Sequence, residues 1–237
     1  MPPRPTLRAV VTDVDGTLTD DRRRLDPEAI RWVRRLEEHG VPVVLATGNV
    51  LPIALALHRS LGLSAPIVAE NGGLIYRKRD GRETVERLAD RSIALRALRA
   101  VRRAGLDARP LFTDRWRETE VAIEPTVPVV AVRRAIRPLP VRAEATGYAV
   151  HLMQRGAGKR RALDRALDDL GLTLRECVVL GDGDNDVGML RAAGFGVSFA
   201  SGSAAARRAA RYVARSPFAA GFVEGLKAST VLARPSS

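Results

Sequence analysis

Residues 7–17 read LRAVVTDVDGT, an apolar run rich in valine that ends in two aspartates and a glycine. A run of this kind, bounded by Gly16, predicts a buried strand. Because side chains two residues apart share one face of a strand, Asp13 and Asp15 can point toward the same spot. They would lie at the carboxyl end of the strand, where parallel sheets bind their ligands. An ordinary strand end followed by an Asp-Gly turn has the same pattern, so this stretch alone does not establish a site.

The segments that follow this strand alternate between short apolar runs and amphipathic stretches with helix caps. Further strands are predicted at 41–46, 66–69, 74–76, 177–180, 196–199 and 212–213, and helices at 26–40, 52–61, 158–170, 187–193, 203–210 and 218–227. This order is typical of an α/β fold with a doubly wound, Rossmann-like parallel sheet.

The pattern changes in the middle of the chain. Helices predicted at 91–104 and 129–136 are mixed there with half-buried strands at 121–124 and 148–153. We therefore expect a catalytic core built from residues 1–79 and 155–237, with a smaller α+β cap domain, residues 80–154, inserted between its two halves.

The composition narrows the class of protein. The net charge is +12, but residues 80–154 hold 14 basic and 10 acidic side chains and the rest of the chain holds 25 and 17, so the basic excess is spread evenly. Nucleic-acid surfaces are usually stripes or patches, so we expect no nucleic-acid partner, although a nucleic-acid-binding protein of the same fold stays an alternative. No apolar run is long enough to span a membrane, and the start of the chain has no signal-peptide pattern. A single cysteine, Cys177, fits a reducing compartment, and we expect a cytoplasmic protein.

A second acidic segment, Gly-Asp-Gly-Asp-Asn-Asp at 181–186, follows the valine-rich strand at 177–180. Carboxylates crowded at the end of a strand repel one another unless a cation is present. An all-oxygen cluster favours a hard ion such as Mg²⁺ or Ca²⁺ over zinc. Which of Asp182, Asp184 and Asp186 would bind the ion stays open at this point. A solvated acidic turn is the alternative.

Two further segments have a local pattern that suits a phosphate group. Thr47-Gly48-Asn49 ends a predicted strand and precedes a helix, where a hydroxyl and unpaired backbone N–H groups can bind an anion, although an ordinary strand-to-helix turn looks the same. Lys159 begins a predicted helix and is one of three lysines among 39 basic residues. A lysine kept in such an arginine-rich chain indicates that a compact point charge is needed there, the alternative being a solvated surface lysine.

The four segments occur in the order D-x-D-G-T, T-G-N, Lys and G-D-G-x-N-D, which resembles the phosphatases of the haloacid dehalogenase superfamily. The predicted insertion resembles that superfamily's C2-type cap. The resemblance implies that Asp13 attacks phosphorus and that Asp15 serves as acid and base. It also implies Mg²⁺ held by Asp13, Asp15, Asp182 and Asp186, with a small phosphate monoester bound by Thr47, Gly48, Asn71 and Lys159.

Two stretches give a narrower resemblance. ATGNVLP at 46–52 and AENGG at 69–73 are similar to the archaeal-type phosphoglycolate phosphatases. This resemblance implies hydrolysis of 2-phosphoglycolate; a sugar phosphate or a phosphoglycerate glycoside is the alternative substrate. Candidates for a clamp on the substrate carboxylate are the cap arginines Arg109, Arg115, Arg117 and Arg142. The sequence leaves the oligomeric state open.

Overall fold

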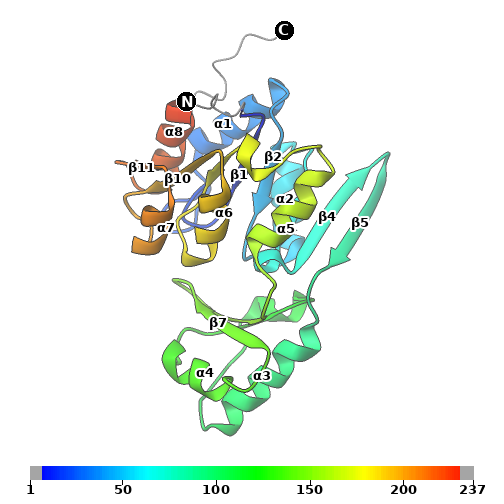
Figure 1. The fold of residues 1–237 in the computed structure, drawn as a ribbon, viewed down its shortest axis with the longest axis vertical. Helices are drawn as coiled ribbons and strands as arrows, with labels where there is room; N and C mark the ends of the chain where they lie inside the picture. Colours follow the sequence, from blue (N-terminus) through cyan, green and yellow to red (C-terminus); the bar gives the residue numbers. More distant parts are fainter. Residues whose placement is uncertain (1–6, 230–237) are drawn as a thin grey trace.

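The computed structural model describes residues 7–229 and divides them into a larger α/β part and a smaller part stacked against one end of it (Figure 1). The predicted core ranges extend to residues 1–6 and 230–237, and these ends, like the start of the chain considered for a signal peptide, lie outside the described residues. Among the described residues, no helix is long and apolar enough to cross a membrane.

The larger part contains an eight-stranded sheet with the strand order β11-β10-β9-β1-β2-β3-β4-β5. The strands from β11 to β3 are parallel to their neighbours, and β4 and β5 are added antiparallel at one edge. The strands are β1 Ala9–Thr12, β2 Val43–Ala46, β3 Ile67–Ala69, β4 Leu74–Arg79, β5 Arg82–Arg87, β9 Cys177–Leu180, β10 Phe195–Phe199 and β11 Tyr212–Ala214. The predicted α/β fold with a doubly wound sheet is therefore confirmed.

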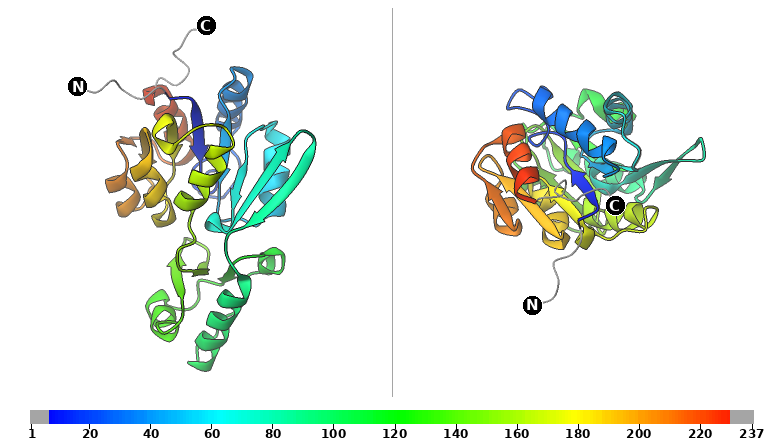
Figure 2. Two further views of the ribbon diagram at one scale, coloured as in Figure 1. Left: turned by 45° about the vertical axis from the view of Figure 1, so that its right-hand side comes forward. Right: turned by 90° about the horizontal axis from the view of Figure 1, so that it is seen from above.

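Six helices pack on the two faces of this sheet within the described chain. They are α1 Pro27–Glu38, α2 Leu51–Leu61, α5 Lys159–Asp168, α6 Val187–Ala192, α7 Ala204–Ala209 and α8 Phe218–Ser229. Helices α1, α2 and α8 cover one face, and α5, α6 and α7 cover the other. Figure 2 (right) shows α1, in blue, and α5, in yellow-green, on opposite sides of the strands.

Burial on both faces of the sheet explains why β1 is an apolar run. Val10 of β1 packs into the core under α1, and its neighbours Ala9 and Val11 pack into the core under α5. A strand covered on both faces is expected to be continuously apolar rather than alternating. Because β1 lies between β2 and β9 in the centre of the sheet, the residues that follow it, Asp13 first, are held in a fixed position.

The ends of the helices follow ordinary capping chemistry. Asp26 precedes α1, and its carboxylate accepts the backbone N–H groups of Glu28 at 2.8 Å and Ala29 at 3.1 Å, with Pro27 in the first turn. Helix α2 ends at Gly62, whose φ of 73° is the left-handed conformation that glycine adopts without strain. Both helices were predicted from these residues.

The smaller part is a three-stranded antiparallel sheet with the strand order β6-β8-β7 and two helices packed on it. Its elements are α3 Arg91–Arg103, β6 Val121–Ile123, α4 Val129–Ala135, β7 Val141–Ala145 and β8 Val150–Gln154, with a short 3₁₀ helix at Phe112–Trp116. It has a hydrophobic core of its own, which includes Leu98, Val132 and Leu152. We call this part the cap.

Two strands were not predicted. β5 has the sequence RETVER and is almost entirely exposed, and β7 lacks an apolar run, so neither carries the signal of a buried strand. β5 falls within residues 80–154 but pairs with β4 in the large sheet, whereas the small sheet spans residues 121–154. The division of the chain into a core and a cap at residues 80 and 154 stays a prediction.

Candidate active site

The loops that follow β1, β2 and β9 come together at the carboxyl edge of the large sheet, which faces the cap (Figure 1). Asp13 directly follows β1, and its backbone N–H donates to the carbonyl of Leu180 at the end of β9, at 3.0 Å. Lys159 is the first residue of α5. The sheet topology thus brings together residues that are far apart in the sequence.

Lys159 is the centre of the site. Its side chain is fully buried, and its Nζ lies 3.0 Å from Asp13 Oδ1 and 2.7 Å from Asp186 Oδ1. Burial by itself would lower the pKa of this amine, but the ion pairs with Asp13 and Asp186 raise it above its ordinary value, so the ammonium is charged at neutral pH. The alternative of a solvated lysine is therefore wrong.

The acidic loop after β9 is arranged around Asp186. The Oδ2 atom of Asp186 accepts the backbone N–H groups of Asp182 at 3.0 Å and Gly183 at 2.9 Å, which fixes the course of the loop. Asp182 lies close to Gly16, where a Cβ atom would come within 2.4 Å of Asp182 Oδ2. Since Gly16 also has a φ of 76°, only glycine fits there without displacing the carboxylate.

Three carboxylates form a cluster of the size that holds a cation. One ligand atom from each of Asp13, Asp182 and Asp186 lies within 4.8 Å of the other two. Asp184 is not part of this cluster; its carboxylate accepts the hydroxyl of Ser203 at 2.6 Å.

The electrostatics of the cluster favour a bound cation. Burial and the neighbouring charge of Asp186 raise the pKa of Asp182 to about 7. Burial also raises the pKa of Asp13 well above its usual range; the attraction of Lys159 opposes this, and the repulsion of Asp186 and Asp182 adds to it. A divalent ion would relieve this repulsion, and an all-oxygen donor set fits a hard ion. These residues therefore fit a divalent cation.

Asp15 is held by groups from three segments. Its Oδ2 accepts Asn49 Nδ2 at 2.6 Å and the hydroxyl of Tyr148 at 3.3 Å, and its Oδ1 accepts Arg23 Nε at 3.1 Å. The guanidinium of Arg23 also lies over the Tyr148 ring, 4.2 Å from its centroid. Tyr148 belongs to the cap, so the carboxylate of Asp15 joins the two parts of the molecule.

The residues predicted to bind phosphate do not all face the same space. Thr47 is buried, and its hydroxyl accepts the backbone N–H of Asn49 at 3.0 Å. Gly48 lies beside Asn71, where a Cβ atom would come within 2.9 Å of the amide oxygen. Asn71 has its amide nitrogen 3.1 Å from Glu120 of the cap, and its amide oxygen accepts Asn185 Nδ2 at 2.9 Å. Asn71 therefore connects the acidic loop to the cap.

A cavity of about 100 Å³ opens between these loops and the cap. Its lining includes Asp13, Asp15, Gly48 and Asp182 from the core, and the β7–β8 turn at residues 145–148 from the cap. The predicted nucleophile and acid thus open into one small enclosed space whose roof is a tight turn of the cap. Thr47, Asn71 and Lys159 are buried and are not part of this lining. Lys159 instead borders a neighbouring hollow of about 280 Å³, which shares Asp184 and Asn185 with the cavity.

The four arginines considered as a carboxylate clamp do not line this cavity. Arg117 is buried and donates to the carbonyl of Gly48 at 3.0 Å and to Glu120. Arg142 forms an ion pair with Glu144. The Nε atom of Arg109 lies 3.1 Å from Asp107 Oδ2. The guanidinium group of Arg115 lies over the ring of Phe112, 4.2 Å from its centroid. Composition carries no information on side-chain direction, and the structure gives each of the four a different partner. Of the four, only Arg142 lines the neighbouring hollow that Lys159, Asp184 and Asn185 also border.

A buried contact between core and cap was missed by the sequence argument. Glu70 follows β3 and accepts the backbone N–H groups of Glu118 at 3.0 Å and Thr119 at 2.9 Å, as well as the Thr119 hydroxyl at 2.6 Å. Burial raises the pKa of Glu70, and the hydroxyl of Thr119 opposes that rise. Glu70 lies in the AENGG stretch, which was quoted for its resemblance without a role for the glutamate. No local pattern singled out Arg23 or Tyr148.

Comparison with known proteins identifies the family. The family model of haloacid dehalogenase-like hydrolases matches residues 10–116 and 136–226, which is most of the chain. The chain belongs to the haloacid dehalogenase-like hydrolases. The predicted family is thereby confirmed.

Similar members of this haloacid dehalogenase-like family include named enzymes. A phosphoglycolate phosphatase of Methanothermobacter thermautotrophicus is 35% identical over 221 residues, covering 93% of this chain and 98% of the relative. A phosphoglycolate phosphatase of Archaeoglobus fulgidus is 32% identical over 220 residues, covering 93% and 96%. The family match and these relatives make the chain a phosphatase.

Several solved structures share the fold of this chain. A Thermoplasma acidophilum protein has a TM-score of 0.86 at 26% identity and covers 95% of this chain and 99% of its own. A sugar phosphatase of subclass IIB has a TM-score of 0.77 at 18% identity and covers 94% and 99%. The second likeness concerns the fold alone.

Proposed function

We propose that this phosphatase hydrolyses 2-phosphoglycolate to glycolate and orthophosphate, with Mg²⁺ as its metal ion and Asp13 as its nucleophile. The observation that carries the mechanism is the buried Lys159 ammonium bound to Asp13 and Asp186 beside Asp182. A charged lysine that touches a carboxylate at the mouth of a cavity can bind a phosphate oxygen and that carboxylate at the same time.

The reaction proceeds in two displacements. In the first, an Asp13 carboxylate oxygen attacks phosphorus while the bond from phosphorus to the ester oxygen breaks, and protonated Asp15 gives its proton to the leaving alcohol. In the second, Asp15 takes a proton from a water molecule that attacks the aspartyl-phosphate, so that orthophosphate leaves and Asp13 is restored. Splitting one displacement into two lowers the highest barrier, which is the advantage of covalent catalysis.

The geometry around Asp15 supports this acid and base role. Asn49 and Tyr148 both bond Oδ2, and Arg23 bonds Oδ1, so the carboxyl group is held in one orientation toward the cavity. Positioning of this kind is a large part of catalysis in phosphoryl transfer, where the protein mainly orients groups and stabilises charge.

The metal ligands in this proposal are Asp13, Asp182 and Asp186 through their carboxylates, and Asp15 through its backbone carbonyl. Mg²⁺ bound there supplies positive charge that neutralises the phosphoryl oxygens and the crowded carboxylates. Thr47, Gly48 and Lys159 serve the phosphate group. Asn71 supports that site indirectly, since its side chain bonds the cap and the acidic loop.

The size of the cavity and the named relatives support 2-phosphoglycolate as the substrate. About 100 Å³ lies below the range usual for pockets that hold drug-sized ligands. The cavity adjoins a hollow of about 280 Å³ that shares Asp184 and Asn185 in its lining. A two-carbon phosphate ester fits the cavity without that hollow, whereas a hexose phosphate would extend into it. The alternative is a sugar phosphate or a phosphoglycerate glycoside, and the similarity in fold to a subclass IIB sugar phosphatase keeps it in the test.

The test is the release of orthophosphate from a panel of phosphate monoesters in the presence of Mg²⁺. We expect the highest kcat/KM for 2-phosphoglycolate, and a hexose phosphate that exceeds it tenfold would contradict the substrate. In the same assay, Asp13→Asn is expected to abolish turnover, because the amide keeps the size of the side chain and removes the attacking charge. Retention of activity within about tenfold of the wild type would contradict the nucleophile.

A further inference from the structure

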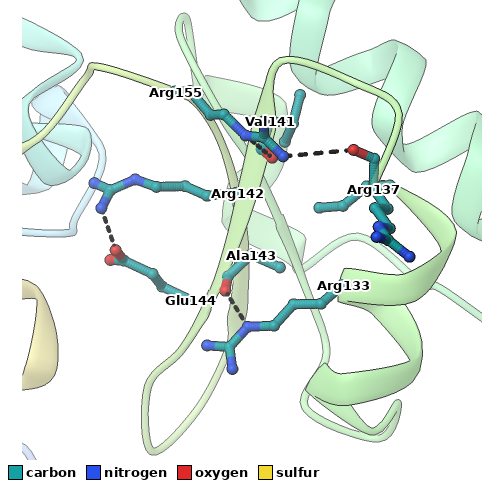
Figure 3. Close-up of a pocket in the computed structure, with 8 residues that line it drawn as sticks. Arg133, Arg137, Val141, Arg142, Ala143, Glu144 and Arg155 are labelled. Carbon is teal, nitrogen blue, oxygen red and sulfur yellow. Dashed lines mark hydrogen bonds and ion pairs between the residues drawn. The ribbon is translucent and has the colours of Figure 1, made fainter.

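A second hollow lies in the cap, over strand β7 (Figure 3). It encloses about 330 Å³, and its charged lining consists of Arg133, Arg137, Arg142 and Arg155 with one acid, Glu144. It shares no lining residue with the active-site cavity. These four arginines and one glutamate give its wall a net charge of +3.

Two of the arginines are held in place by the backbone of β7. Arg133, at the end of α4, donates its Nε to the carbonyl of Ala143 at 3.0 Å, and Arg155, after β8, donates its Nε to the carbonyl of Val141 at 3.2 Å. β7 is an edge strand, so these alternate carbonyls point away from β8. Figure 3 shows the two guanidinium groups lying over the strand from its opposite ends.

Protection of the strand edge explains part of this arrangement but not all of it. Unpaired carbonyl groups at the edge of a sheet can form hydrogen bonds with a strand of another chain, and an arginine N–H that occupies one of them prevents this. However, Arg133 uses one of its five N–H donors for this purpose. Tethering through Nε leaves both terminal nitrogens of Arg133 for another acceptor, and these form the fork that binds phosphate and carboxylate groups. In Arg155 one terminal nitrogen also lies 3.5 Å from the carbonyl oxygen of Arg137.

The remaining charges of the wall are not neutralised within the described part of the chain. Glu144 is paired with Arg142, which also donates to the carbonyl of Ala157 at 2.9 Å. No ion pair is recorded between Arg133, Arg137 or Arg155 and any carboxylate among residues 7–229. Arg133, Arg137 and Arg155 are exposed, so solvent and salt screen part of the repulsion between them. An anion placed among them would remove the part that is left.

We infer that this hollow is an anion site of the cap and that it takes a small molecule with two or more phosphate groups. Three guanidinium groups without a carboxylate partner around the wall exceed what a single phosphate needs, since one phosphate is bound bidentately by one or two forks. The volume falls at the lower end of the range for small-molecule pockets. Arg142 and Glu144 also line the hollow beside Lys159, but Arg133, Arg137 and Arg155 line neither that hollow nor the active-site cavity. Anion binding by these three arginines therefore does not depend on the proposed function.

The experiment is a calorimetric titration of the full chain, freed of metal ions with EDTA, with sodium tripolyphosphate as the probe. Arg137→Gln is the main variant, because no hydrogen bond or ion pair of its guanidinium group is recorded in the described chain and its replacement leaves β7 intact. Arg133→Gln/Arg155→Gln is the second variant. Arg134→Gln is the matched control, since Arg134 neighbours Arg133 on α4, is exposed, and does not line the hollow.

We expect saturable binding to the wild type, binding about tenfold weaker or more in both sets of variants, and binding within about twofold of wild type in Arg134→Gln, as hydrogen bonds to charged groups predict. Orthophosphate should bind far more weakly than tripolyphosphate. The inference is overturned by a lack of binding to the wild type, by an equal loss in Arg134→Gln, by retained binding in Arg137→Gln and the double variant, or by equal affinity for orthophosphate. A single-stranded oligonucleotide that binds more tightly than the probe and depends on the same arginines would also overturn it.

Discussion

Replacement of Lys159 tests the active-site geometry most directly. Its ammonium makes the two contacts that link the nucleophile to the acidic loop, at 3.0 Å to Asp13 and 2.7 Å to Asp186, with no part of the side chain exposed. We consider two substitutions, Lys159→Met, which keeps the length and removes the charge, and Lys159→Arg, which keeps the charge and changes its shape.

The expected loss of activity follows from the role of a fixed positive charge in phosphoryl transfer. Removal of one preorganised electrostatic contact typically costs about 10²–10³ in kcat. Lys159→Met should lose at least that much. Lys159→Arg should lose a similar amount, because the planar guanidinium group is larger than the ammonium that fits between Asp13 and Asp186. Overpacking a buried position of this kind costs about 1–3 kcal/mol.

The stability of Lys159→Met should also fall. Removing one partner of a buried ion pair costs about 3–5 kcal/mol, since the remaining charge is left without compensation. Mg²⁺ should recover part of this loss, because the cation then carries the charge that the lysine supplied. Urea unfolding with EDTA and with Mg²⁺ measures both quantities.

The assay is steady-state release of orthophosphate from 2-phosphoglycolate, with Lys78→Arg as the control. Lys78 lies on β4 and is exposed, so the same substitution there should leave kcat near that of the wild type. The reasoning is refuted if Lys159→Arg keeps kcat within about threefold of the wild type, since a contact of this kind is worth much more.

Three further predictions concern the groups around this lysine. In the metal-free folded protein the pKa of Asp182 is about 7, against an ordinary value of 3.8. Between these two pH values the folded state holds a proton that the unfolded state has lost, so the protein should lose stability as the pH rises from about 4 to about 7. The increase in Tm on adding Mg²⁺ should then be larger at about pH 8 than at about pH 5. Asp182→Asn should reduce this difference, and the part that stays would come from Asp13, whose pKa is also raised. An equal increase at both pH values in the wild type would contradict the prediction. Tyr148→Phe, which removes the hydroxyl bound to Asp15 at 3.3 Å, should reduce kcat by about two- to tenfold, as measured by phosphate release, and an unchanged kcat would show that this bond does not position the acid. Glu70→Gln should lower the free energy of unfolding by about 1–3 kcal/mol in urea, because the Thr119 and Glu118 backbone donors lose a charged acceptor, and a change below about 0.5 kcal/mol would argue that the cap is held elsewhere.

The parts of the fold that were predicted correctly are those whose sequence pattern is set by burial. β1 and β9 are covered on both faces, which makes them continuously apolar, and α1 has its cap residues in the expected order. β5 was not predicted, because a strand of an exposed two-stranded ribbon needs no apolar residues. The backbone hydrogen bonds to β4 hold it, and those bonds have no signature in side-chain composition.

The same distinction applies to the site. Asp13 and Asp182 follow buried strands, so their position in space could be deduced from sheet topology. The contact between Tyr148 and Asp15 joins residues 133 positions apart in sequence, across the boundary between cap and core, and depends on how the two parts dock. For the same reason the sequence could not show where the four candidate arginines point. The side chain of Arg117, for example, donates to the backbone carbonyl of Gly48.

The amide side chains show how composition can nevertheless point to such contacts. The chain has three asparagines and one glutamine. Each asparagine bonds within the site: Asn49 holds Asp15, and Asn185 donates to Asn71, which in turn contacts Glu120 of the cap. These positions need a neutral side chain that can donate a hydrogen bond, and Asn71 must also accept one. A carboxylate in any of these places would add a negative charge to a crowded cluster of acids. A residue type that is rare in the chain is therefore found where its hydrogen-bonding groups are used, and Asn71 lies at the junction of core and cap, which hydrophobic periodicity could not reveal.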